Sequence, residues 1–191
     1  MSSSARLTSA GLALVLVAAG GAGCGTGGGV AQVNGISREL IVAYDDAHPT
    51  GTLSFPSTTY ESVTQFALPD GEHRPIRLRF QLGAPGQLAI TIYATTLLET
   101  PGEALRTLSC DASKEDVSDG TDGRWIVADL GDMKPLKGVV WIGVRKLGGE
   151  PTLWASSVAS GHAFVRNNDP NNLMGLLPTK RTPMVRIEVA P

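Results

Sequence analysis

Two neighbouring segments of the chain alternate apolar and polar residues. Residues 74–82 place apolar side chains on one face and Arg77, Arg79 and Gln81 on the other. Residues 86–94 repeat the alternation. A period of two is typical of a strand with one buried face. Because the Gly-Ala-Pro-Gly sequence of residues 83–86 is a turn signal, the pattern predicts that the two strands form a hairpin.

Seven further segments are predicted to be strands. They are residues 39–44, 60–68, 124–130, 137–146, 152–156, 162–166 and 184–189. No stretch of about ten residues or more has a helical period. Residues 139–144 are apolar on both faces, which indicates a central strand. About nine strands without intervening helices predict an all-β fold, an antiparallel β-sandwich of the jelly-roll type.

Composition and charge narrow the class of protein. The chain has 191 residues, 23 glycines and 12 prolines, which suits many short strands joined by turns. Its net charge is −2, whereas a nucleic-acid binder would show a basic stripe. We therefore expect no nucleic acid among its partners. Residues 36–191 are enough for one domain that folds on its own core without a metal or other cofactor.

The first 23 residues are expected to be a cleaved signal peptide. Arg6 lies in a short polar segment, and residues 12–19 form an apolar run. This run is shorter than the roughly 20 residues that span a bilayer, and it fits the apolar region of a signal peptide. The sequence therefore predicts export, and an uncleaved membrane anchor is a weaker alternative.

Small residues precede Cys24. The Gly-Ala-Gly-Cys sequence of residues 21–24 resembles a bacterial lipobox, where signal peptidase II cleaves before a lipid-modified cysteine. Ala22 and Gly23 match that motif, whereas Gly21 stands where an aliphatic residue is usual. The resemblance implies lipidation of Cys24 and a lipid anchor in the membrane. With glycine at position 25, it also implies a place in the cell envelope at the outer membrane or cell surface.

The glycine-rich residues 24–35 are expected to be a flexible tether between the lipid and the domain. The alternative is an ordinary signal peptide cut near Ala22, which would leave Cys24 unmodified or bonded to Cys110. If Cys24 carries lipid, we expect Cys110 to be a small buried residue near Leu108.

An acidic loop is the first candidate site. Asp116, Asp119 and Asp122 lie close together with Asp111 and Glu115, and calcium is bound by flexible loops rich in carboxylates. The spacing does not match an EF-hand. The alternative is a solvated turn in which the aspartates cap backbone N–H groups. We favour this turn and expect no metal.

An asparagine-rich loop is the second candidate. Asn167, Asn168 and Asp169 supply amide and carboxylate groups, and Trp154 is the tryptophan expected to be most exposed, which would make it a stacking platform for a sugar. The same residue types are also the usual residues of turns. The apolar residues 173–177 that follow would either contact a partner or cover an open end of the sandwich.

Residues 141–189 loosely resemble the last strands of galactose-binding-like jelly-roll domains, in which a strand containing Trp leads to a Gly-rich turn. No metal-spaced histidines and no Gly-x-Ser-x-Gly motif occur. We therefore expect a non-enzymatic envelope module that binds a glycan or an envelope protein. A structural or assembly component using residues 173–177 is the alternative, and a secreted hydrolase is a third possibility.

Overall fold

The computed structural model describes residues 39–171 and 174–191. The expected signal peptide, Cys24 and the tether therefore lie outside the described residues. The described part contains twelve strands and one short 3₁₀ turn, η1 (Lys114–Asp116). The strands are β1 (Leu40–Val42), β2 (Gly51–Ser54), β3 (Tyr60–Ala67), β4 (Arg74–Phe80), β5 (Leu82–Thr95), β6 (Pro101–Ala112), β7 (Ile126–Asp129), β8 (Val139–Ser156), β9 (Ala163–Asn167), β10 (Met174–Pro178), β11 (Thr182–Pro183) and β12 (Val185–Ala190). No helix in this part is long and apolar enough to span a membrane.

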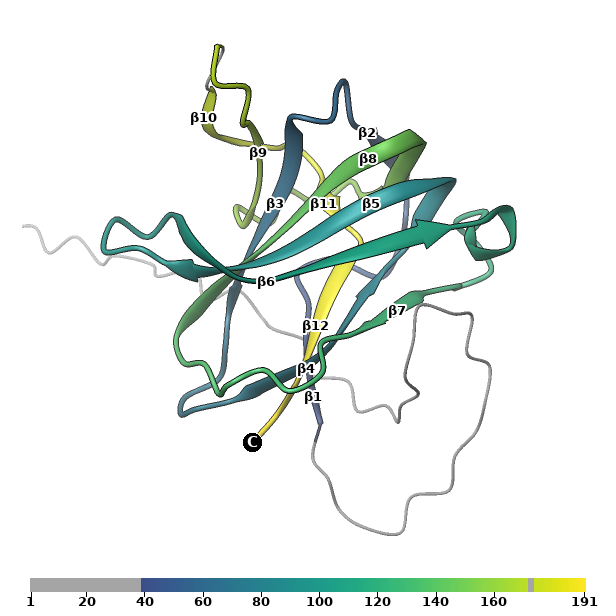
Figure 1. Ribbon diagram of the computed structural model, residues 1–191. Helices are drawn as coiled ribbons and strands as arrows, with labels where there is room; N and C mark the ends of the chain where they lie inside the picture. Colours follow the sequence, from purple (N-terminus) through teal and green to yellow (C-terminus); the bar gives the residue numbers. More distant parts are fainter. Residues whose placement is uncertain (1–38, 172–173) are drawn as a thin grey trace, which may run out of the picture.

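The strands form two antiparallel sheets that pack face to face (Figure 1). The smaller sheet has the order β1-β12-β4-β7, and the larger has the order β10-β9-β3-β8-β5-β6, with β2 and β11 also paired to β8. Along the chain the core strands alternate between the sheets, except that β5 and β6 both belong to the larger one, and β1-β12-β4-β7 faces β3-β8-β5-β6. This is the arrangement of a jelly roll. The predicted all-β sandwich is therefore confirmed.

Apolar side chains from both sheets fill the space between them. The smaller sheet contributes Leu78 and Ile187, and the larger contributes Leu88, Ile90 and Ile142, each almost fully buried. Burying one such side chain is worth about 1.5–3 kcal/mol. Cys110 belongs to the same core and is 3% exposed, as expected for a small buried residue.

The predicted hairpin of residues 74–82 and 86–94 is wrong, because β4 and β5 belong to different sheets. The chain passes between the sheets at Gln81. Its N–H donates to the carbonyl of Met184 beside the smaller sheet, and its carbonyl accepts from the N–H of Trp154 in the larger sheet. Both strands direct apolar residues into the same core from opposite sides, so the period of two could not separate them.

Two other boundaries differ from the prediction. Residues 83–86 are not a turn but an irregular part of β5 that pairs with β8 through register shifts. The strands predicted at 137–146 and 152–156 are one strand, β8, which continues through Gly148 and Gly149. Strands β2, β6, β10 and β11 were not predicted. The central position of residues 139–144 is confirmed, because β8 lies between β3 and β5.

Candidate functional site

Polar side chains collect on the outward face of the larger sheet, the face turned away from the sandwich core. Along β8, Val140, Ile142 and Val144 belong to the core, whereas the residues between them face outward. The register places Glu61 of β3 opposite Arg145 of β8 and Arg166 of β9. Three neighbouring strands therefore bring charged residues to one place.

Glu61 is fully buried although it lies on this outward face. The Tyr93 hydroxyl donates to Oε1 at 2.8 Å. Oε2 accepts from Nε of Arg166 at 2.7 Å and from Nδ2 of Asn168 at 3.2 Å. We call Glu61, Tyr93, Arg166 and Asn168 the Glu61 cluster. Its members come from β3, β5, β9 and the residue that follows β9, so the cluster joins strands that are far apart in sequence.

Gly143 makes room for this cluster on β8. A Cβ atom at this position would lie 2.0 Å from Oε1 of Glu61 and 2.8 Å from a ring carbon of Tyr93. These distances are much shorter than a van der Waals contact, so any larger residue would displace both side chains. The glycine therefore allows Glu61 and Tyr93 to meet directly above the central strand.

Electrostatics keep Tyr93 protonated. Burial raises the pKa of the Tyr93 hydroxyl above its ordinary value, and the nearby Glu61 carboxylate raises it further by charge repulsion and by accepting the hydroxyl proton. The Arg166 guanidinium lies 4.7 Å from the centre of the Tyr93 ring, within range of a cation–π interaction. The phenol therefore acts as a donor to Glu61 and as a surface for Arg166.

Aromatic residues and a second arginine border the cluster. Trp141 is only 2% exposed and packs against Phe164, with ring centres 5.5 Å apart. The indole N–H of Trp141 has no hydrogen-bond partner within the described residues. Arg145 is half-buried, and its guanidinium reaches the carbonyl of Thr58 at 3.5 Å. The outward face thus combines two arginines, an exposed amide at Asn168 and half-buried aromatic rings.

The asparagine-rich loop contributes only partly to this site. Asn168 is exposed and belongs to the Glu61 cluster. Asn167 is buried opposite Tyr60, and its side-chain carbonyl accepts the N–H of Asp169. The Asp169 carboxylate accepts the N–H of Asn171. Asn167 and Asp169 therefore shape the turn that holds Asn168 beside Glu61.

Trp154 lies in a different environment. Its indole N–H donates to the carbonyl of Ser118 at 2.8 Å. A Cβ atom on Gly120 would lie 3.0 Å from the Trp154 ring, so the ring covers this glycine. The structure joins Trp154 to the acidic loop, and Asn168 to the Glu61 cluster.

The acidic loop uses its carboxylates to organise its own backbone. Asp116 accepts from the N–H and hydroxyl of Ser113, and Asp119 accepts from two backbone N–H groups and the Thr121 hydroxyl. Asp122 accepts from the Ser118 hydroxyl and the Arg124 N–H. These hydrogen bonds lower the pKa of both carboxylates. For Asp119 the largest cause is the bond from the Thr121 N–H, and for Asp122 it is the bond from the Ser118 hydroxyl.

The hydrogen bonds of the acidic loop are those of a capped turn. In residues 39–171 and 174–191, no group of three or more His, Cys, Asp or Glu side chains is placed to hold a metal ion. A calcium ion needs six to eight oxygen ligands that point to one centre, whereas each of these carboxylates points to its own N–H and O–H donors.

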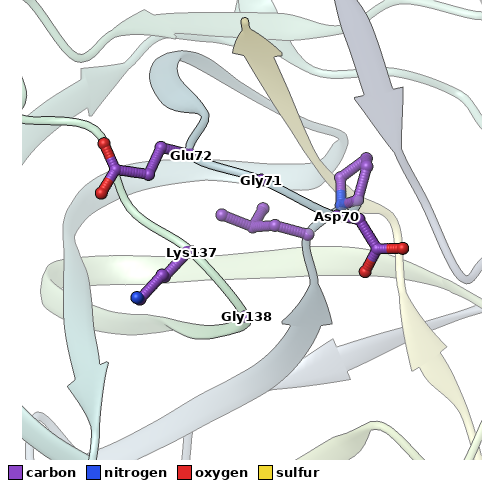
Figure 2. Close-up of a pocket in the computed structure, with 7 residues that line it drawn as sticks. Asp70, Gly71, Glu72, Lys137 and Gly138 are labelled. Carbon is purple, nitrogen blue, oxygen red and sulfur yellow. The ribbon is translucent and has the colours of Figure 1, made fainter.

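A shallow hollow of about 640 Å³ lies beside the connection between β3 and β4. Figure 2 shows the Glu72 carboxylate and the Lys137 ammonium group on one side and the Asp70 carboxylate on the other. The charged groups diverge, whereas a built ligand site has polar groups that converge on one position. The Glu61 cluster is therefore the stronger candidate.

Comparison with known proteins does not assign the chain to a family. No protein-family model, no curated protein and no solved structure matches the chain. The candidate site therefore rests on its own chemistry. A carboxylate that is fully buried and bonded to an arginine, a phenol and an amide is held in place as an acceptor. Its bonds orient the side chains of Arg166, Tyr93 and Asn168.

Proposed function

We propose that this chain is an exported lipoprotein of the cell envelope whose β-sandwich is a non-enzymatic binding module for an acidic glycan. The lipobox-like residues 21–24 support the lipid anchor at Cys24. The observation that carries the binding role is the fully buried Glu61 on the outward face of the larger sheet, bonded to Arg166, Tyr93 and Asn168.

Burial of Glu61 on this outward face has an energetic cost. Removing a carboxylate from water costs several kcal/mol, and its ion pair only partly offsets this cost. On an outward face, apolar residues or solvated charges would avoid the cost. Glu61 instead fixes the orientation of an arginine and an amide beside aromatic rings, and preorganised donors bind a ligand with a smaller loss of entropy.

The charges on this face favour an acidic sugar. Arg145 and Arg166 lie on the two strands that flank Glu61 in the register, so the three residues together carry one net positive charge. A guanidinium group binds a carboxylate through two parallel hydrogen bonds. Half-buried Tyr93 and Phe164 supply apolar surface for the sugar ring.

The test is a titration of the full-length chain with polygalacturonate oligomers, with dextran as the neutral comparison. We expect binding of the acidic oligomers and an affinity at least about tenfold lower in Arg145→Ala, since a charged hydrogen bond contributes about 1.5–3 kcal/mol. Arg74→Ala is the matched control, because Arg74 is exposed on the smaller sheet. Equal binding of both polymers, or an Arg145→Ala variant that binds like the control, would contradict the proposal.

A second candidate function is that of an assembly component. Strand β10 is the last strand of the larger sheet, and Leu177 on this strand is 48% exposed. An edge strand with an exposed apolar residue is suited to a protein contact. Under this alternative, Leu177→Ser would weaken recovery of the chain in an envelope complex and would leave glycan binding unchanged.

A further inference from the structure

The tip of the β5–β6 hairpin exposes two adjacent leucines. The two strands pair as far as Thr95 and Pro101, and Figure 1 shows their connection standing out from one side of the body. Leu97 is 104% exposed and Leu98 is 85% exposed, the highest values among the large apolar residues of the described part. Two leucines in full contact with water are unusual for a rigid turn.

Hydrogen bonds within the turn fix the backbone that carries these leucines. The N–H of Thr96 donates to the carbonyl of Thr100 at 2.9 Å, and the N–H of Glu99 donates to the carbonyl of Thr96 at 3.0 Å. The N–H groups of Leu98 and Thr100 both donate to the Thr96 hydroxyl. Glu99 adopts a left-handed conformation with φ of 56°, which costs on the order of 1 kcal/mol. The leucines are therefore held outward by a defined structure.

We propose that this tip inserts into the surface of a lipid bilayer, the membrane to which the chain is anchored. This inference rests on the lipid anchor at Cys24. The 15 residues that follow Cys24, up to Glu39, can span about 50 Å when extended. The domain therefore stays within reach of the bilayer, and the anchor raises the effective concentration of the tip at the membrane.

The chemistry of the tip favours lipid over a protein pocket. The N–H groups of residues 98–100 are bonded within the turn, so little unpaired backbone would enter the apolar layer. A single apolar contact of this size gives only weak, reversible membrane binding, which becomes stable when it is added to a lipid anchor.

The headgroup preference follows from the charges. Residues 95–105 contain Glu99 and Glu103 and no lysine, arginine or histidine. The negative charge of the tip is repelled by anionic lipid headgroups, which attract basic segments instead. The tip therefore inserts into zwitterionic bilayers in preference to anionic ones.

The experiment uses the mature lipidated chain, residues 24–191, in phosphatidylcholine vesicles with brominated acyl chains. Leu98→Trp adds a fluorophore at the tip, and Leu147→Trp is the matched control at an exposed leucine on β8. We expect the emission added at position 98 to shift to the blue and to lose at least about half its intensity on brominated lipid. The emission added at position 147 stays unchanged. Adding phosphatidylglycerol should reduce the quenching at position 98.

Equal quenching at the two positions, or none at position 98, would overturn the inference. A tip that stays in water while the chain becomes dimeric would assign the leucines to a second copy and would also overturn it. The mass of the N-terminal peptide that begins at Cys24 shows whether the chain is lipidated, and so separates these results from a chain that has no lipid anchor. If Cys24 carries no acyl group, coupling the same variants to vesicles through a maleimide lipid at Cys24 still tests the tip. Glycan titration is independent of both measurements.

Discussion

The two sheets each carry a fully buried glutamate on the outward face, and the partners of these glutamates differ. Glu188 on the smaller sheet is paired with Arg77, at 3.0 Å, and with Arg79, and Arg77 also pairs with Glu39. Glu61 on the larger sheet is bonded to one arginine, one phenol and one amide. The Glu188 network consists of ion pairs between glutamates and arginines. The Glu61 cluster combines one ion pair with two neutral donors, a phenol and an amide.

This difference supports the proposal that the Glu61 cluster, and not the Glu188 network, takes part in recognition. Around Glu188, charges of opposite sign on β4, β12 and the residue before β1 satisfy one another. Around Glu61, the donors lie beside aromatic rings. The absence of a side chain at Gly143 of the central strand leaves the space that Glu61 and Tyr93 occupy. A closed ionic network offers little to a ligand, whereas oriented donors beside apolar rings are typical of ligand sites.

The largest expected effect comes from removing each glutamate. Glu61→Ala and Glu188→Ala should each lower the free energy of unfolding by about 2–4 kcal/mol, because each leaves an arginine without its buried partner. Urea denaturation measures this loss. Only Glu61→Ala should also abolish glycan binding. If Glu188→Ala abolishes binding as well, the proposed contrast between the two faces is wrong.

The next effect sharpens the comparison at Gly143. The Gly143→Ala variant should cost about 1–3 kcal/mol in stability, because the new methyl group collides with Glu61 and Tyr93. It should also weaken glycan binding by displacing these two side chains. Gly175→Ala on β10 is the control, since nothing lies within 4 Å of its Cβ position. A stable Gly143→Ala variant with normal binding would show that the close approach of Glu61 is not needed.

The sequence predicted the sandwich because alternation marks which residues face the core. It did not predict strand pairing, since β4 and β5 show the same period and reach the core from opposite sheets. It also missed β6, whose residues 103–107 are exposed. An edge strand buries little on either face and so lacks the alternation that identifies strands.

The candidate site was only partly accessible to sequence reasoning. Asn168 was predicted as a binding residue, and the structure places it beside Glu61. Glu61, Tyr93 and Arg166 were missed, because the cluster depends on register between strands that are about 30 to 100 residues apart. The signal available in the sequence was a charged residue near one end of each of two predicted strands: Glu61 at the start of 60–68 and Arg166 at the end of 162–166. Its significance depends on which strands are neighbours.

A smaller effect distinguishes the two glutamates at high pH. The raised pKa of Tyr93 means that the folded protein keeps the phenol proton at a pH where the unfolded chain releases it. This contribution to stability is fully present below pH 10 and is lost as the pH rises through the folded-state value. Tyr93→Phe should remove this alkaline loss and cost about 1 kcal/mol at neutral pH, the value of one hydrogen bond. In the part of the chain that the structure describes, no tyrosine hydroxyl bonds to Glu188, whose partners are Arg77 and Arg79, so Arg77→Ala should leave the alkaline loss unchanged. Denaturation at several pH values measures both.

The smallest expected effect is an unchanged Tm when calcium is added. It tests whether the carboxylates of the acidic loop, like those of the Glu188 network, are fully used by partners within the protein. The carboxylates of Asp119 and Asp122 already accept hydrogen bonds within residues 118–124. These bonds hold the two carboxylates in orientations that do not converge on one centre, so the loop would have to rearrange to surround an ion. A calcium site occupied at 100 times its Kd would add about 2.7 kcal/mol to stability, which raises the Tm of a domain of this size by about 5–10 °C. We expect equal Tm values in 1 mM calcium and in EDTA. A rise of several degrees would show that the loop has acceptors to spare, and Asp119→Asn would then have to abolish the rise.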